Sequence, residues 1–358
     1  MKTKAISYAV LLVAPAFLAF QPSGTEISFH VQEGSSKTKT FTNSVSMALD
    51  DMQMLMNGQE SPMMPSIDMN IDSSVEIQVT DEYVKMRDGV PAKLQRTYDS
   101  LGESREMAME MDIMGNVQNQ DNSSSSSSEL EGETVLFTWS ADDDEYIPTF
   151  PDGDGDEDLL ENLAEDMDFR SLLPEGSVSP GDEWKVDPVA LKRVLTPGGD
   201  LKLVSEEEAE DASMMGMDND MGKFDDWFSE DVEGKVTATF KEMSEAEDGT
   251  SVAVITFAIK VENAVDLTEK MQEGLADADM PMEGAEMDIK SMDIEIALEG
   301  EATLFWNVSE GCAHSFELST EMMLTVDISM AISTQGMDMD IDQSMEFSGT
   351  LTSAASFE

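Results

Sequence analysis

The amino-acid sequence predicts a mainly β protein, built on a large curved antiparallel sheet or half-barrel. Apolar and polar residues alternate strictly over long stretches, and helical periodicity is scarce. The strand-like stretches fall into an N-terminal half, 25–114, and a C-terminal half, 234–358, on either side of a central segment. Alternation with period two gives each strand one apolar and one polar face, which is typical of antiparallel sheets.

The individual strands are expected to be long. Thirteen residues alternate from Ile67 to Val79, or roughly 40 Å of strand, so the sheet must bend strongly to enclose a core. Asp50 and Asp51 interrupt the alternation of the preceding strand, which predicts a β-bulge there. Similar alternation recurs at 107–113, 253–261, 292–298, 322–332 and 341–351.

Helical signals are confined to a central α/β insert, 133–204. One helix is predicted over 156–173, where leucines recur at helical spacing and Pro174 follows. A second is predicted over 188–195, because Asp187 can cap a helix whose first residue is Pro188. We expect both helices to pack on the concave side of the sheet.

Two further segments read as connectors. Residues 115–132 contain six consecutive serines and are expected to be a flexible linker. Residues 205–233 contain 12 acidic residues and a single base, Lys223, and are expected to be an extended acidic loop. Segments 67–80 and 337–350 share seven of fourteen residues, so a duplicated sheet is one form the fold would take.

The first 24 residues predict an export signal. Lys2 and Lys4 precede an apolar run of 16 residues, Ala5–Phe20, which is shorter than the roughly 20 that span a membrane. We therefore expect a periplasmic or extracellular protein, with an uncleaved anchor as the alternative. Cys312 is the only cysteine, so no intrachain disulfide can form.

The charge limits the partners. Twenty basic and 76 acidic residues give a net charge of −56. Nucleic acids and anionic membrane surfaces bind through Lys and Arg, so both are excluded as expected partners. Cations and an apolar small molecule or lipid remain.

Two metal sites are considered. Asp154, Asp156, Asp158 and Glu165 occupy positions 1, 3, 5 and 12 of an EF-hand-like loop. The sixth position is Leu159 instead of the required glycine, so only a weak Ca²⁺ site is expected, and no other cofactor. Clustered methionines at 63–64, 214–217 and 280–282 have the soft ligands that Cu(I) prefers.

No catalytic site is recognisable, and we expect a non-enzymatic protein. Cys312 and His314 share a strand face, but no third group that would orient a thiol–imidazole pair is apparent. Phosphate-binding loops and zinc motifs are also lacking from the sequence.

One short element resembles a family. The residues Leu173, Pro174, Val178, Gly181, Asp182 and Trp184 resemble the "LP…V…GD.W" turn-strand element of uncharacterised exported bacterial proteins. The resemblance implies export and assigns no activity. The expected architecture is similar in shape to the half-barrel of periplasmic lipoprotein carriers.

The leading hypothesis is a binding or carrier protein for a lipid or acyl chain. The alternatives are a structural acidic envelope or surface protein that binds Ca²⁺ weakly and, third, Cu(I) handling. The residues expected to line the apolar site are Met107, Met109, Met111, Ile294, Ile296, Leu324, Val326, Ile328 and Met330.

The charge also makes stability salt-dependent. The Debye length falls from about 10 Å at 0.1 M salt to about 3 Å at 1 M, so repulsion among the carboxylates weakens as NaCl is added. We expect the thermal midpoint of unfolding to rise with NaCl, and to rise further with CaCl₂ at equal ionic strength. Equal responses to the two salts would contradict a specific calcium site, and a flat response to both would contradict the charge argument.

Overall fold

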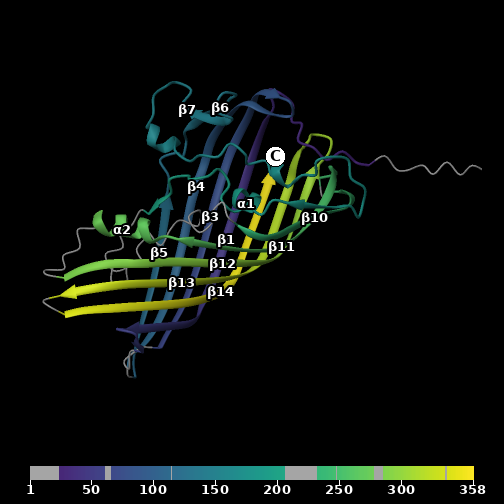
Figure 1. The fold of residues 1–358 in the computed structure, drawn as a ribbon. Coiled ribbons are helices and arrows are strands. Elements are labelled where there is room, and N and C mark those ends of the chain that lie inside the picture. The colour runs from purple at the N-terminus through teal and green to yellow at the C-terminus, as the bar shows by residue number, and fades with distance from the viewer. Residues whose placement is uncertain are drawn as a thin grey trace, which may run out of the picture.

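The computed structural model describes residues 24–60, 66–113, 115–205, 232–246, 248–277, 285–334 and 337–358. These residues form one large, open antiparallel sheet of 14 strands with two short α-helices (Figure 1), which confirms the predicted fold class. Residues 1–23 of the predicted signal peptide and 206–231 of the predicted acidic loop lie outside the described residues.

The order of strands across the sheet is β7-β6-β4-β3-β1-β14-β13-β12-β11-β10-β8, and β5 pairs with β4 beside β6. The two segments that resemble each other in sequence lie in β3 and β14, on either side of β1. The strands are β1 (Ser36–Met56), β2 (Gln59–Glu60), β3 (Ser66–Arg87), β4 (Val90–Ile113), β5 (Asn116–Ser127), β6 (Thr134–Ser140), β7 (Glu145–Thr149), β8 (Glu183–Val186), β9 (Val204–Ser205), β10 (Glu233–Glu245), β11 (Ser251–Asp266), β12 (Ala285–Asn307), β13 (Cys312–Thr334) and β14 (Met337–Phe357).

The alternation of the sequence becomes an inner and an outer face of the sheet. On β3, Ile71, Ile77 and Val79 are buried, whereas Asp72 and Gln78 are exposed. Each long strand thus contributes one apolar row to the inner face, against which the central insert packs.

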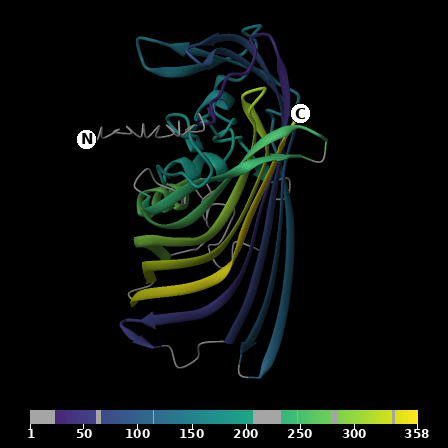
Figure 2. The same ribbon diagram turned by 90° about the vertical axis from the view of Figure 1, so that its right-hand side faces the viewer.

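A bulge in β1 divides the sheet at the end away from the insert. The pairing of β1 with β14 shifts register between Leu49 and Asp51, which confirms the predicted bulge. Pairing of β1 with β3 ends at Ala48 and Asn70, whereas pairing with β14 continues to Met56. Beyond this point one blade contains the ends of β1 and β11–β14, and the other contains β3, β4 and β5. Figure 2 shows the first blade curving away from the straighter second one.

The insert covers the inner face at the opposite, proximal end. Its α-helix α1 (Ala190–Leu195) confirms the helix predicted over 188–195, and all but two of its side chains are buried. Phe169 from the insert packs in edge contacts with Phe41, Phe316 and Phe357 of three strands. The proximal half of the sheet therefore has a closed aromatic core.

The helix predicted over 156–173 is wrong. That segment contains only two 3₁₀ turns, η1 (Glu157–Leu160) and η2 (Arg170–Leu172). Asn162 and Phe169 adopt left-handed conformations, with φ of 61° and 58°, that a continuous right-handed helix does not allow. The extended path between the two turns places Glu165 and Asp168 against the sheet.

The prediction of a flexible linker over residues 115–132 is also corrected. Residues 116–127 form β5, because their backbone groups find antiparallel partners along β4, with Ser124 opposite Arg105. The predicted insert likewise contributes β6, β7 and β8 to the sheet. Helix α2 (Thr268–Asp277), which was not predicted, contacts β12.

A buried ion network joins the insert to the three central strands. Lys39 of β1 lies 2.7 Å from Asp81 of β3 and 2.6 Å from Asp168 of the insert. Arg96 of β4 binds both carboxylate oxygens of Asp81 and donates to the carbonyl oxygens of residues 164 and 165. The Tyr83 hydroxyl donates to Asp168 at 2.6 Å. These contacts fix the insert on the sheet by charge as well as by packing.

The charges of this network shift one another's pKa values. Burial opposes ionisation of Asp81, but Arg96 and Lys39 outweigh it and lower the pKa of Asp81 to about 2. Burial likewise opposes the charge on Lys39, yet Asp168 and Asp81 raise its pKa above the ordinary value. Both partners therefore remain charged at neutral pH.

Glu165 differs from Asp81 because its pKa is raised and not lowered. The insert pairs Arg170 with both Glu165 and Asp166. Two buried cations, Lys39 and Arg96, and the half-buried Arg170 then face four carboxylates. Burial is the largest effect on Glu165 and raises its pKa to about 7, although Arg170 opposes the shift. Oxygen Oε1 of Glu165 has no hydrogen-bond partner among the described residues.

The Lys39→Met substitution tests the network. It leaves Asp168 buried with only the Tyr83 hydroxyl as a donor, so we expect a loss of about 3–5 kcal/mol in the free energy of unfolding, measured by urea denaturation. The matched control is Lys260→Met, which removes a cation from an ion pair that is 68% exposed and should change stability little. Equal effects of the two variants would contradict the role of the network.

Glu165 gives a pH dependence of defined sign. Its pKa is raised from 4.5 to about 7 on folding, so the native state binds the extra proton between these values. The stability contribution of this group falls as pH rises through that window, by on the order of 3 kcal/mol.

The Glu165→Gln variant keeps the shape of the side chain and makes it permanently neutral, so it no longer ionises as pH rises. We expect it to be more stable than the wild type at pH 8 and to gain little at pH 4, with both measured by urea denaturation. The same difference at both pH values would show that ionisation of Glu165 is not the cause.

Candidate functional site

The apolar inner face continues beyond the part that the insert covers. In the two blades many inward-facing apolar side chains are half-buried, although Met109, Ile289 and Met292 are buried, whereas most of those in the proximal half are buried. We call nine of them the methionine surface, since six are methionine: Met52, Met54, Met56, Ile67, Met107, Met111, Ile328, Met330 and Ile341.

Strand pairing brings these residues together within each blade. In the first blade Ile341 of β14 lies between Met56 of β1 and Met330 of β13. In the second, Ile67 of β3 lies opposite Met111 of β4. At the junction of the blades, Met47, Met69 and Met345 are almost completely buried. The surface is thus continuous with the hydrophobic core at one side and partly exposed at the other.

The structure separates the nine residues that the sequence singled out. Met107, Met111, Ile328 and Met330 belong to the half-buried methionine surface. The other five are buried within the hydrophobic core: Met109, Ile294, Ile296, Leu324 and Val326. Those five lie on the same inner face but are covered, so they are not open to a ligand.

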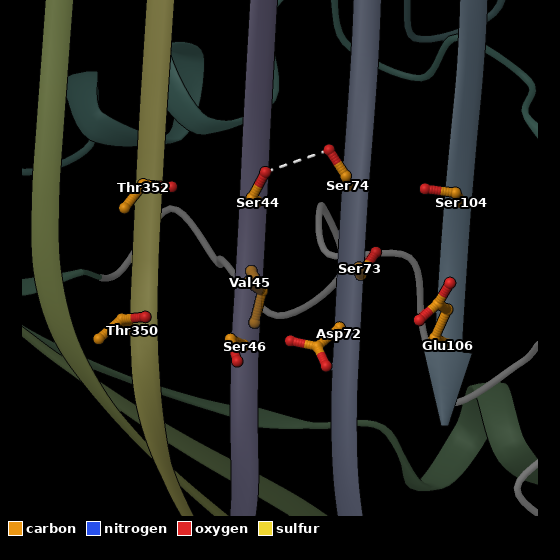
Figure 3. A pocket seen from close by; sticks show the side chains of 10 residues that line it. All are labelled: Ser44, Val45, Ser46, Asp72, Ser73, Ser74, Ser104, Glu106, Thr350 and Thr352. Atoms are coloured by element: carbon orange, nitrogen blue, oxygen red, sulfur yellow. Dashed lines mark hydrogen bonds between the residues drawn. The ribbon is translucent and has the colours of Figure 1, made fainter. Parts of the chain in front are cut away.

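The outer face differs in chemistry. It carries a shallow hollow of about 270 Å³ across β14, β1, β3 and β4, lined mainly by hydroxyl and carboxylate side chains (Figure 3). The hydroxyls of Ser44 and Ser74 lie 3.1 Å apart, and Asp72 lies opposite Glu106 on the neighbouring strand. An apolar ligand in this hollow would have to displace water from these hydroxyl and carboxylate groups, so the hollow does not favour such a ligand.

The four predicted calcium ligands do not form one site. Asp156 caps η1 by accepting a hydrogen bond from the backbone of Asp158, and Asp154 is exposed. Glu165 is buried and paired with Arg170. Over the described part of the chain, no three His, Cys, Asp or Glu side chains gather in a metal-binding arrangement.

Cys312 is a poor nucleophile in this structure. Its side chain is buried, and burial raises the pKa of the thiol to about 11, so the reactive thiolate is scarce at neutral pH. The methionine clusters considered for Cu(I), at 63–64, 214–217 and 280–282, lie outside the described residues.

The turn-strand element around Trp184 has a structural role. The Asp182 carboxylate accepts a hydrogen bond from the backbone of Ser179, and β8 follows as an edge strand beside β10. The indole of Trp184 is half-buried and donates to the carbonyl oxygen of Leu172. The element therefore fastens the insert to one edge of the sheet.

The charged residues of the ion network were not predicted from the sequence. Lys39, Asp81 and Arg96 occupy inward-facing positions of strands whose other inward residues are apolar. A charge at such a position is the signal that could have found them, because a buried charge requires a partner.

Comparisons with known proteins do not identify a family. No protein-family model matches the chain, and no curated protein matches its sequence. One similar solved structure is the outer membrane protein OprG from Pseudomonas aeruginosa, at 6% identity and a TM-score of 0.22, covering 92% of this chain and 99% of that chain. A similarity this weak supports no conclusion about fold or function. Within the described residues, neither helix is long and apolar enough to cross a membrane.

Proposed function

We propose that this protein is an exported, non-enzymatic binding or carrier protein for a single-chain lipid, which it holds on the methionine surface. The observation that carries the proposal is the mismatch between the long apolar inner face and the shorter insert that covers it. Contiguous exposed apolar surface on a soluble protein usually marks a binding site. The basic signal-like N-terminus and the acidic composition support export.

The composition of the surface favours a flexible apolar ligand. Methionine is unbranched and polarisable, so a row of methionines adapts to chains of different length and unsaturation. A structural surface would be served equally well by Leu, Ile and Val, whose shapes are better defined.

A matched pair of substitutions on β13 tests this function. Met330 faces inward on the methionine surface, whereas Met323 faces outward and is 64% exposed. A fluorescent single-chain lipid is titrated into delipidated full-length protein. We expect micromolar binding by the wild type and by Met323→Asp, and at least about tenfold weaker binding by Met330→Asp, because the new carboxylate loses solvation beneath the chain.

Two results would contradict the proposal. One is the failure of the delipidated wild type to bind the lipid at micromolar concentration. The other is equal weakening by the inward and outward substitutions, which would indicate a nonspecific effect of charge.

A further inference from the structure

A single arginine lies beside the methionine surface on the inner face. Arg105 is on β4, two residues before Met107. Its neighbours Ser104 and Glu106 line the hollow of the outer face (Figure 3). Successive side chains of a strand point to opposite faces, so Arg105 points inward. Its side chain is half-buried.

Within the described residues Arg105 has no ion pair, unlike Lys39 and Arg96 of the same inner face. No carboxylate of the described residues lies within the 4.0 Å of an ion pair, although the chain has 76 acidic residues and only 20 basic ones. Glu103, two residues earlier on the same face, instead accepts a hydrogen bond from Ser73. The inner-face cations Lys39, Arg96 and Arg170 all have buried carboxylate partners.

The edge of the sheet beside Arg105 adds neutral polar groups. Strand β5 places Ser124 opposite Arg105, Asn122 opposite Met107 and Gln120 opposite Met109. These three side chains are half-buried, uncharged and able to donate hydrogen bonds. A row of donors thus runs beside the apolar row of β4 without adding a negative charge.

We infer that Arg105 is a head-group site, and that the ligand is a fatty-acid anion whose carboxylate binds Arg105 while its chain lies over Met107 and Met111. This inference rests on the proposed function. The guanidinium fork matches the two oxygens of a carboxylate. Strand residues rise by about 3.4 Å, so the stretch from Arg105 to Met111 is roughly 20 Å long, comparable with a long acyl chain.

The test separates the head group from the chain. Hexadecanoate and hexadecanol are titrated by calorimetry, at pH 8, into the delipidated full-length wild type and into Arg105→Gln, Arg105→Lys and Lys260→Gln. Lys260→Gln is the matched control, since it removes one positive charge from the outer face, where Lys260 pairs with Glu299.

We expect the wild type to bind hexadecanoate at least about tenfold more tightly than hexadecanol, because a hydrogen bond between Arg105 and a charged carboxylate is stronger than one to a neutral hydroxyl. Arg105→Gln should lose this preference while binding hexadecanol as the wild type does. Arg105→Lys and Lys260→Gln should retain a preference for the anion.

The failures are distinguishable. Equal binding of the two probes by the wild type, or an unchanged preference in Arg105→Gln, would overturn the head-group site and leave the apolar site standing. If the wild type binds neither probe, the proposed function is overturned together with this inference.

Discussion

The long strands of this sheet extend past the insert that covers them. Their inner face is nevertheless apolar along nearly its whole length. An insert of about seventy residues, 133–204, closes the proximal half, where Phe41 and Phe316 are buried against Phe169. Apolar side chains in the distal half keep the same alternation but lack an equivalent cover within the described residues. The bulge at Asp50 divides the distal half into two narrower blades. Each blade still has an apolar inner face.

The buried ion network lies in the proximal half of the sheet. Asp81 receives charged hydrogen bonds from Lys39 and Arg96, and Arg96 also binds the backbone of the insert. Ion pairs of this kind contribute less to net stability than to a single arrangement of the elements they join, because the cost of removing charges from water offsets much of their attraction. We interpret the network as a device that sets where the insert ends and where the open surface begins.

The sequence predicts the sheet well and the covering of the sheet poorly. Period-two alternation is a local property, so the strands, their inner faces and the bulge at Asp50 follow from it directly. The extended path of 161–169 depends on distant partners, since Lys39 pairs with Asp168 and Arg96 donates to the backbone carbonyl of Glu165. For the site, alternation alone places Met107 and Met330 on the inner face, whereas the burial of Leu324 and Val326 depends on curvature that no local pattern encodes.

Strand β5 has a further consequence for the second blade. Its serines from 123 to 126 lie along β4 opposite residues 103–106 and offer four identical side chains in a row. Register is normally fixed by a pattern of different side chains, and a polar repeat offers no such pattern. A slip of two residues would place Ser126 opposite Arg105, so the arginine would keep a serine partner, but it would also move Ser124 opposite Met107 in place of Asn122. The register of β5 therefore depends on its two ends, where Asn116 pairs with Ile113 beside the turn and Ser126 pairs with Ser205 of β9.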